Sequence, residues 1–241
     1  MGICVMLLAY KEEENLRVLL PKIIEQMDKL PERYSITVID TEEPTDNTSD
    51  VCREYGARYV NQRYPKFGGA FRTAIEEASA DKFLILDSDG SHDPKYIPDI
   101  YKLFTEGRYD VVIGSRYTKG GSTNDAKSSQ IMSHMLNFAY GIVLGINAKD
   151  LSTDYRMYRT KQLKRLNLTC QNYDVLEETL LKLKIDKKKL KGKKLRVGEV
   201  PIHFEKRMYG ESKRQLIPFI IDYIKTLFRL LGLRVKSTFA K

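Results

Sequence analysis

Cysteine is scarce in this chain of 241 residues. The three cysteines, at positions 4, 52 and 170, are too few and too far apart for a disulfide framework, and none forms a zinc-binding CxxC pair. Acidic residues are also in deficit, with 32 Asp+Glu against 41 Lys+Arg and a formal net charge of +9. This surplus favours nucleic acid, a phosphorylated substrate or an anionic membrane surface as partner. The hydrophobic content of 42% excludes a disordered chain.

Targeting signals and long apolar runs are missing too. The N-terminus lacks a basic segment and a cleavage site, so we expect no signal peptide, and Met6 stands where a myristoylation signal requires Ser or Thr. The one long uncharged stretch, residues 128–148, contains polar residues such as Ser133 and Asn137. We therefore expect a buried globular helix there rather than a membrane span, and a cytoplasmic protein.

Short apolar segments alternate with helical patterns along the chain. The expected strands are Ile3–Ala9, Ser35–Asp40, Arg58–Asn61, Lys82–Leu86, Asp110–Ile113 and Leu195–Val200. The expected helices are Asn15–Leu30, Thr48–Tyr55, Gly68–Ala80, Tyr96–Glu106, Ser129–Leu144 and Tyr173–Leu183, followed by a basic loop at Lys187–Lys194. This order predicts an α/β fold with a doubly wound, mostly parallel sheet and helices on both faces.

Polar residues follow several of the expected strands, where ligands bind in such sheets. Asp87 and Asp89 come directly after a buried strand, separated by the small residue Ser88. Both carboxylates can reach one divalent cation, and oxygen ligands suit Mg²⁺ or Mn²⁺. The alternative is a turn that leads into the next helix through Asp93-Pro94. We expect the nearby His92 to be a structural hydrogen-bonding residue.

Seven short segments in register resemble the motifs of family 2 glycosyltransferases with the GT-A fold, in particular dolichyl- and polyprenyl-phosphate mannosyltransferase-like enzymes. They are residues 9–16 (AYKEEENL), 38–48 (VIDTEEPTDNT), 66–70 (KFGGA), 86–94 (LDSDGSHDP), 112–121 (VIGSRYTKGG), 150–158 (DLSTDYRMY) and 207–213 (RMYGESK). The chain departs from the family pattern at Thr41, which interrupts an acidic pair after Asp40.

The resemblance implies an inverting transferase that uses a nucleotide-sugar donor (GDP-mannose or a UDP-hexose) with Mg²⁺ or Mn²⁺. The implied donor-binding residues are Tyr10, Glu12, Asp40, Lys66, Asp87, Ser88 and Asp89, and the implied metal ligands are Asp87, Asp89 and Ser91. The implied phosphate- or acceptor-binding residues are Arg116, Arg156, Arg207, Ser212 and Lys213, and the implied catalytic residues are Asp89, Arg116, Asp154 and Lys213. For each basic residue the alternative is ordinary surface charge.

Two acceptors are compatible with these motifs. A polyprenyl phosphate is already anionic near neutral pH and needs no protein base. A saccharide hydroxyl needs one, and Asp154 is the candidate, with helix capping or an ion pair as its alternative role. A non-catalytic nucleotide-sugar-binding module is a third hypothesis. Nucleic acid is disfavoured, because the basic residues lack interleaved aromatic residues.

The last part of the chain has a broad apolar helical face between Leu216 and Val235, with basic residues beside it. Such a helix can lie in a membrane interface, pack on the core or form a homodimer contact. We expect a catalytic domain over residues 1–213 and an amphipathic helical extension over residues 214–241. Peripheral contact with the cytoplasmic membrane face is the expected use of this extension.

Overall fold

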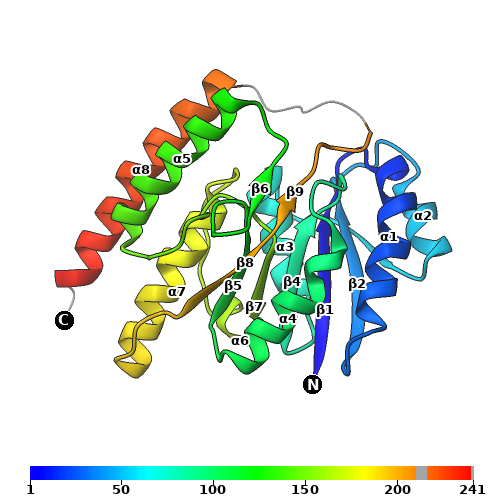
Figure 1. The fold of residues 1–241 in the computed structure, drawn as a ribbon, viewed down its shortest axis with the longest axis horizontal. Coiled ribbons are helices and arrows are strands. Elements are labelled where there is room, and N and C mark those ends of the chain that lie inside the picture. Colours follow the sequence, from blue (N-terminus) through cyan, green and yellow to red (C-terminus); the bar gives the residue numbers. More distant parts are fainter. Residues whose placement is uncertain (210–215, 240–241) are drawn as a thin grey trace.

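A computed structural model describes residues 1–209 and 216–239 and has three layers, with helices on both faces of a central sheet (Figure 1). The strands of this sheet lie in the order β3-β2-β1-β4-β7-β5-β8. They are β1 (Gly2–Leu8), β2 (Arg33–Asp40), β3 (Arg58–Asn61), β4 (Lys82–Asp87), β5 (Val111–Ser115), β7 (Arg156–Arg159) and β8 (Val197–Pro201). The predicted α/β class with a mostly parallel sheet is confirmed.

The strands bury both of their faces because successive side chains point to opposite sides of the sheet. In β1, for example, Cys4 and Met6 join one core cluster, whereas Val5 and Leu7 join the other. β1 is parallel to both β2 and β4, so their carboxyl ends meet at one edge. This edge collects the polar residues that follow the strands.

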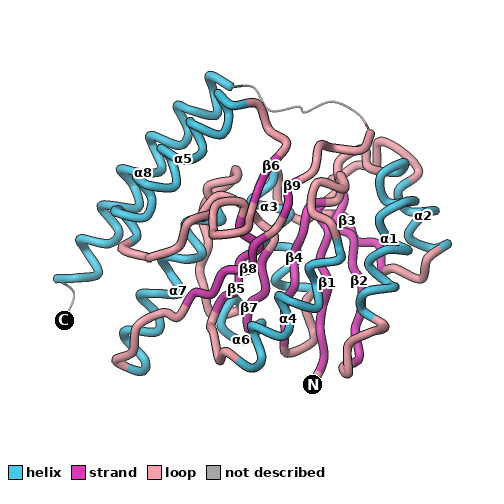
Figure 2. Tube along the Cα trace, in the orientation of Figure 1, coloured by secondary structure: helices cyan, strands magenta, loops and turns pink. Residues whose placement is uncertain are grey.

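Helices cover both core clusters, as the cyan tubes of Figure 2 show. One face is covered by α1 (Glu13–Met27), α2 (Thr48–Glu54) and α4 (Ile97–Glu106), with the 3₁₀ turn η1 (Pro94–Tyr96). The other face is covered by α3 (Lys66–Glu77), α5 (Lys127–Leu144), α6 (Thr160–Leu163), α7 (Val175–Lys191) and α8 (Leu216–Phe239). A small second sheet pairs β6 (Ser122–Thr123) with β9 (His203–Phe204).

The antiparallel strand β7 was not predicted. It lies between β4 and β5, and its register pairs Ile85 with Arg156 and Lys82 with Arg159. When that antiparallel register is continued past the end of the ladder, residue 154 falls opposite residue 87. β7 therefore brings Asp154 to the acidic end of β4.

Two local predictions were wrong. Lys187–Lys194 is not a loop throughout, because α7 continues to Lys191 and ends at Gly192, which has a left-handed φ of 60°. The helix expected to be buried, α5, is exposed along one side, where Phe138 is 73% accessible.

No helix within the described ranges is long and apolar enough to cross a membrane. The domain boundary predicted at residues 213 and 214 lies outside the described residues. α8 places Tyr223 and Leu230 in the same core cluster as α5 and α7. This helix thus packs on the sheet-covering helices of the main body.

Candidate active site

The acidic turn after β4 is the centre of the candidate site. Asp87 ends β4 and is half-buried, and Asp89 follows it in a turn. The Ser91 hydroxyl donates to Asp89 Oδ1 at 2.6 Å and lies 3.4 Å from Asp87 Oδ2, while the Ser91 N–H donates to Asp89 Oδ1 at 3.0 Å. The three residues predicted to bind a metal thus lie together.

A third carboxylate comes to this turn from the segment just before β7. Asp154 is buried, and its Oδ1 lies 3.6 Å from His92 Nδ1, which lies 3.3 Å from Asp87 Oδ2. Ligand atoms of Asp87, His92 and Asp154 all lie within 4.8 Å of one another. The chain therefore brings two carboxylates from separate strands to one point beside an imidazole.

Hydrogen bonds fix the orientation of the imidazole of His92. The backbone N–H of Asp87 donates to Nδ1 at 3.0 Å, and Nε2 lies 3.1 Å from the Thr153 hydroxyl. With Nδ1 accepting, the proton of the neutral ring is on Nε2. Burial lowers the pKa of His92, which favours this neutral form. The contacts support the predicted structural role.

The carboxyl groups have unequal proton affinities. Burial and the neighbouring charge of Asp87, with a hydrogen bond between the two, raise the pKa of Asp154 well above its usual value. Burial would also raise the pKa of Asp89, but hydrogen bonds from Ser91 and the positive charge of Arg207 outweigh it and lower that pKa. The surroundings thus favour the charged form of Asp89 and disfavour the charged form of Asp154.

Arg207 bridges this turn to the end of β1. Its Nε donates to Asp89 Oδ2 at 3.1 Å, and its Nη2 forms a close ion pair with Glu12. Glu12 is buried and also accepts from Asn15 Nδ2 at 2.6 Å. Burial raises the pKa of Glu12, against the lowering effect of Arg207. Glu12, Asp89 and Arg207, predicted from three separate motifs, lie together.

The remaining predicted donor-binding residues lie at or near the same edge in different settings. Asp40 ends β2 and is fully buried, where it accepts from the Tyr59 hydroxyl at 3.0 Å and the Thr41 N–H at 2.7 Å. Tyr10, after β1, and Lys66, at the start of α3, are both exposed. The hydroxyl of Ser88 donates to the backbone oxygen of Leu8 at 2.6 Å, which ties the acidic turn to β1.

Arg116 is bound by a buried carboxylate. Its Nε and Nη2 donate to the two oxygens of Asp150 at 2.7 and 2.8 Å, and Nη2 also donates to the Ser152 hydroxyl at 2.9 Å. Asp150 is fully buried, and the side chain of Arg116 is 10% exposed. This bidentate ion pair holds residues 150–152 against the end of β5.

Arg156 lies in the protein interior, which corrects its expected role as a phosphate ligand. It is 0% exposed and donates to the carbonyl of Leu151 at 2.6 Å, to the Tyr158 hydroxyl at 3.0 Å and to the carbonyl of Leu176 at 3.1 Å. Its guanidinium thus links β7 to α7 and is not accessible to a substrate phosphate. The predicted residues Ser212 and Lys213 lie outside the described residues.

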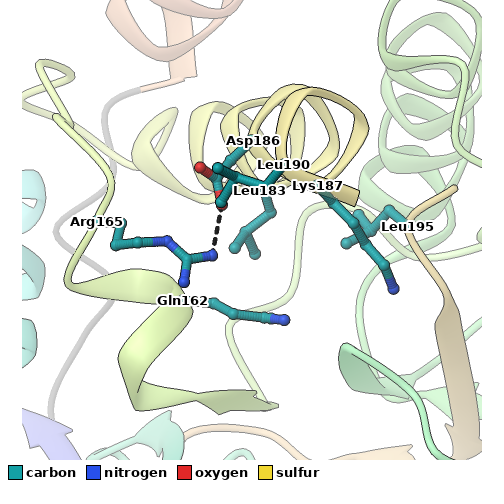
Figure 3. Close-up of a pocket in the computed structure, with 7 residues that line it drawn as sticks. All are labelled: Gln162, Arg165, Leu183, Asp186, Lys187, Leu190 and Leu195. Carbon is teal, nitrogen blue, oxygen red and sulfur yellow. Dashed lines mark hydrogen bonds and ion pairs between the residues drawn. The ribbon is translucent and has the colours of Figure 1, made fainter. Parts of the chain in front are cut away.

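The pocket in Figure 3 lies at the opposite end of β4. Gln162 of α6 and Leu183, Lys187 and Leu190 of α7 line it, with a 2.6 Å ion pair between Arg165 and Asp186 beside them. α6 follows β7, whose last residue pairs with the first residue of β4. The candidate active site is therefore defined by its converging carboxylates and not by this pocket.

The donor set fits a divalent cation of the Mg²⁺ or Mn²⁺ type. Asp87 and Asp154 offer hard oxygen atoms close to one another, and Asp89 offers a further carboxylate in the same turn. A cation between Asp87 and Asp154 would offset the charge repulsion that raises the pKa of Asp154. The sequence placed Asp87 and Asp89 at such a site but gave Asp154 another role. The signal that could have found it is the pattern of residues 150–158, once β7 is recognised as antiparallel to β4.

The model of Glycosyl transferase family 2 matches residues 4–166, more than half of the chain. The chain belongs to this family. It is a glycosyltransferase, as its motifs predicted.

Curated relatives support the assignment over most of the chain. A dolichol-phosphate mannosyltransferase from Pyrococcus furiosus is 28% identical over 239 residues, and the match covers 96% of this chain and 64% of that protein. An undecaprenyl-phosphate mannosyltransferase from Micrococcus luteus is 31% identical over 217 residues and is covered to 84%, with 85% of this chain matched. The chain thus spans less than two thirds of the Pyrococcus protein's length.

A solved structure with the same fold is glucosyl-3-phosphoglycerate synthase from Mycobacterium tuberculosis, in complex with Mn²⁺, UDP and glucosyl-3-phosphoglycerate. The TM-score is 0.71 at 21% identity, with coverage of 96% of this chain and 80% of that one. Another structure of that enzyme contains Mg²⁺ and UDP, with a TM-score of 0.68 at 19% identity. These likenesses confirm the GT-A fold.

Proposed function

We propose that this glycosyltransferase moves a hexose from a nucleoside-diphosphate sugar to polyprenyl phosphate with a divalent cation. The observation that carries the proposal is the approach of Asp154 to Asp87 beside His92 at the carboxyl end of the sheet, with Asp89 in the same turn linked to Asp87 through Ser91 and bound by Arg207. The names of the relatives from Pyrococcus and Micrococcus support the lipid-phosphate acceptor. The donor base and sugar, GDP-mannose or a UDP-hexose, remain alternatives for the experiment.

In this proposal the acidic turn would hold the cation at the place where the donor diphosphate binds. Asp87 and Asp89 would hold Mg²⁺ or Mn²⁺, with Asp154 as a third oxygen ligand beside them. When bound, the cation neutralises the diphosphate and stabilises it as a leaving group. Arg207 adds a second positive charge at this point, and its forked guanidinium suits phosphate oxygens.

The proposed reaction needs no protein base. An oxygen of the acceptor phosphate attacks the anomeric carbon, the bond from that carbon to the diphosphate breaks, and the nucleoside diphosphate leaves. The attack from the opposite face inverts the anomeric centre. The protein contributes by fixing the two substrates in line and stabilising the developing charge. Tyr10 and Glu12 lie at or near this edge and are proposed to contact the nucleoside. Asp40 is fully buried, so we propose that it supports this edge through Tyr59 and Thr41.

The test is transfer of a radiolabelled hexose from GDP-mannose or a UDP-hexose, with Mn²⁺, to a short-chain polyprenyl phosphate. We expect a labelled lipid product with the phosphate and none with the matching unphosphorylated polyprenol. A water-soluble saccharide that accepts the hexose while polyprenyl phosphate does not would contradict the proposal.

A saccharide hydroxyl is the second candidate acceptor, and one observation favours it. Burial raises the pKa of Asp154, so this group can hold a proton at the site. Asp154→Asn distinguishes the two: transfer to polyprenyl phosphate should persist at a reduced rate, whereas base catalysis predicts lost transfer with donor binding intact. The third hypothesis, a non-catalytic nucleotide-sugar-binding module, is set aside because the chain belongs to a family of glycosyltransferases.

A further inference from the structure

Two neighbouring helices expose large apolar side chains in matching stripes. On α5 the exposed residues are Ile131, Met135, Phe138 and Ile142, and on α8 they are Ile224, Phe228, Leu231 and Val235. The spacing is four, three and four residues in both helices, so each set lies along one side of its helix. We call these eight residues the α5–α8 apolar face.

The opposite sides of both helices are fixed by the protein core. Tyr140 of α5 packs edge-to-face on Tyr223 of α8, with ring centres 5.6 Å apart, and Leu230 is buried. Arg234 of α8 donates to the carbonyls of Ile142 and Val143 at the end of α5, at 2.6 and 2.8 Å. The helices lie side by side, as Figure 1 shows. Their orientation is therefore set, and the apolar face points away from the core.

The charge of this region has one sign. α5 and residues 223–237 of α8 contain no acidic residue, and they carry five basic ones: Lys127, Lys225, Arg229, Arg234 and Lys236. Arg229 is paired with Asp174, and Asp222 precedes this stretch of α8, so the excess charge comes mainly from the lysines. Lys127, Lys225 and Lys236 are exposed. An apolar stripe flanked by basic side chains matches an anionic lipid surface, where the apolar groups enter the headgroup boundary and the cations contact lipid phosphates.

We propose that the α5–α8 apolar face docks the enzyme on the surface of an anionic phospholipid bilayer. This rests on the proposed function in one respect, because polyprenyl phosphate is a membrane lipid that the site must reach. Soluble monomers rarely expose a contiguous apolar surface of this kind without a partner. A second copy of the chain fits less well, because two surfaces with this excess of positive charge repel each other.

α5 also links this face to the active site. On its inner side, Asn137 Oδ1 accepts from the Leu151 N–H at 2.6 Å, and the Ser133 hydroxyl lies 3.5 Å from Arg116 Nη2. These contacts hold the segment that leads to Asp154. A bilayer in contact with the outer side of α5 is therefore separated from this segment by one helix, about 10 Å thick.

The test is co-sedimentation of the full chain with vesicles of phosphatidylcholine and phosphatidylglycerol, compared with phosphatidylcholine alone. The double variant Phe138→Asp/Phe228→Asp places charges at the centre of both stripes. We expect the wild type to bind the anionic vesicles and the variant to bind at least about tenfold more weakly, because two large apolar side chains are lost. Leu190→Asp, an exposed leucine on α7 outside the face, is the matched control and should bind like the wild type.

Two results would overturn the docking proposal. One is equal vesicle binding by the wild type and the double variant. The other is a wild type that does not bind vesicles and is dimeric in light scattering, while the double variant is monomeric. That result would assign the α5–α8 apolar face to contact with a second copy of the chain. A thermal melt of the double variant checks that it is folded, as expected for substitutions at exposed positions.

The same preparations separate this proposal from the proposed function. The double variant should transfer hexose to a short-chain, water-soluble polyprenyl phosphate at the wild-type rate but lose transfer to a long-chain acceptor in vesicles. A wild type that binds vesicles and glycosylates neither acceptor would refute the proposed function and leave the docking surface standing. Unchanged transfer to the vesicle acceptor in the double variant would refute the docking surface alone.

Discussion

Two arginine–carboxylate pairs lie near the carboxyl edge of the sheet and differ in accessibility. Arg116 holds both oxygens of Asp150, which is 0% exposed, and the pair is surrounded by protein. Arg207 contacts Asp89 and Glu12 with its side chain 23% exposed, and Asp89 is 22% exposed. Both arginines stand in family motifs, yet only the second pair can exchange its partners without opening the interior.

The difference indicates that the same kind of ion pair, arginine with aspartate, has two different roles in this protein. A buried bidentate pair is costly to separate, so Arg116–Asp150 acts as a fixed support for residues 150–154. A partly exposed pair is less costly to separate, so stronger ligands can replace its partners. Under the proposed function, Asp89 would help to hold the cation and Arg207 would be free to contact the donor phosphates. Four variants test this contrast.

The largest effect is expected from Asp89→Asn. The amide keeps the shape of the side chain but removes the charge that attracts a cation, so we expect the transfer rate to fall on the order of 10³-fold. The thermal melting temperature should change little. Asp99→Asn, an exposed aspartate at the start of α4, is the control. If Asp89→Asn transfers hexose at the rate of the control variant, Asp89 is not part of the active site.

Asp150→Asn tests the buried pair. It leaves the charge of Arg116 unbalanced in the interior, and we expect a loss of about 3 kcal/mol in the free energy of unfolding. Urea unfolding measures this, with Asp50→Asn as the control, since Asp50 is 58% exposed in its ion pair with Arg53. If Asp150→Asn unfolds like the control but loses transfer, the supporting role assigned to this pair is wrong.

A third arginine extends the comparison to pH. Arg156 is buried beside Glu177, but neither carboxylate oxygen of Glu177 accepts a hydrogen bond from another described residue, and burial raises the pKa of Glu177 from 4.5 to about 8. The folded protein thus keeps a proton that the unfolded chain releases. The stability from this group is fully present below pH 4.5 and is lost as the pH rises through about 8.

Glu177→Gln should therefore lose less stability than the wild type between those two pH values. At about pH 8 we expect a gain on the order of 2 kcal/mol in the free energy of unfolding relative to the wild type. Urea titrations across this range measure it, and Glu25→Gln on α1, whose side chain is 65% exposed, should follow the wild type. Identical pH profiles for all three proteins would mean that Glu177 is ionised in the folded state.

The smallest effect is expected from Arg207→Gln, which should strengthen the binding of Mn²⁺ and weaken the binding of the donor. Without the guanidinium, Asp89 and Glu12 are more negative, so Mn²⁺ alone should bind about threefold more tightly. The KM for the donor should rise about tenfold, because a charged contact to phosphate is lost. Arg207→Lys should restore part of the donor affinity but not the forked geometry. Weaker binding of Mn²⁺ alone would contradict the proposed exchange.

The sequence predicted much of the fold because its strands are apolar and its helices have regular spacing. Strand β7 was not predicted because its four residues begin and end with arginine, which is not typical of a buried strand. Arg156 is buried through hydrogen bonds that no local sequence pattern reveals. The last two turns of helix α7 were not predicted for a related reason. Lysine and leucine favour helix without giving an apolar stripe, so a charged segment was interpreted as a loop.

The site was predictable where adjacent residues carry it. Asp87 and Asp89 are two positions apart, and their proximity follows from the sequence alone. The approach of Asp154 depends on the register of β7, and the link from Arg207 to Glu12 joins residues 195 positions apart. Likewise the motifs predicted similar phosphate-binding roles for Arg116 and Arg156. Only the packing shows that Arg116 forms a supporting ion pair and that Arg156 lies in the core.

Calorimetric titration of Mn²⁺ with GDP or UDP into the wild type and Asp89→Asn tests the central claim most directly. The claim is that the carboxylates of Asp87, Asp89 and Asp154 hold a cation together with the donor diphosphate. We predict that in the wild type each of cation and nucleotide tightens the binding of the other, and that this coupling disappears in Asp89→Asn. Equal coupling in both proteins, or none in the wild type, would contradict the account.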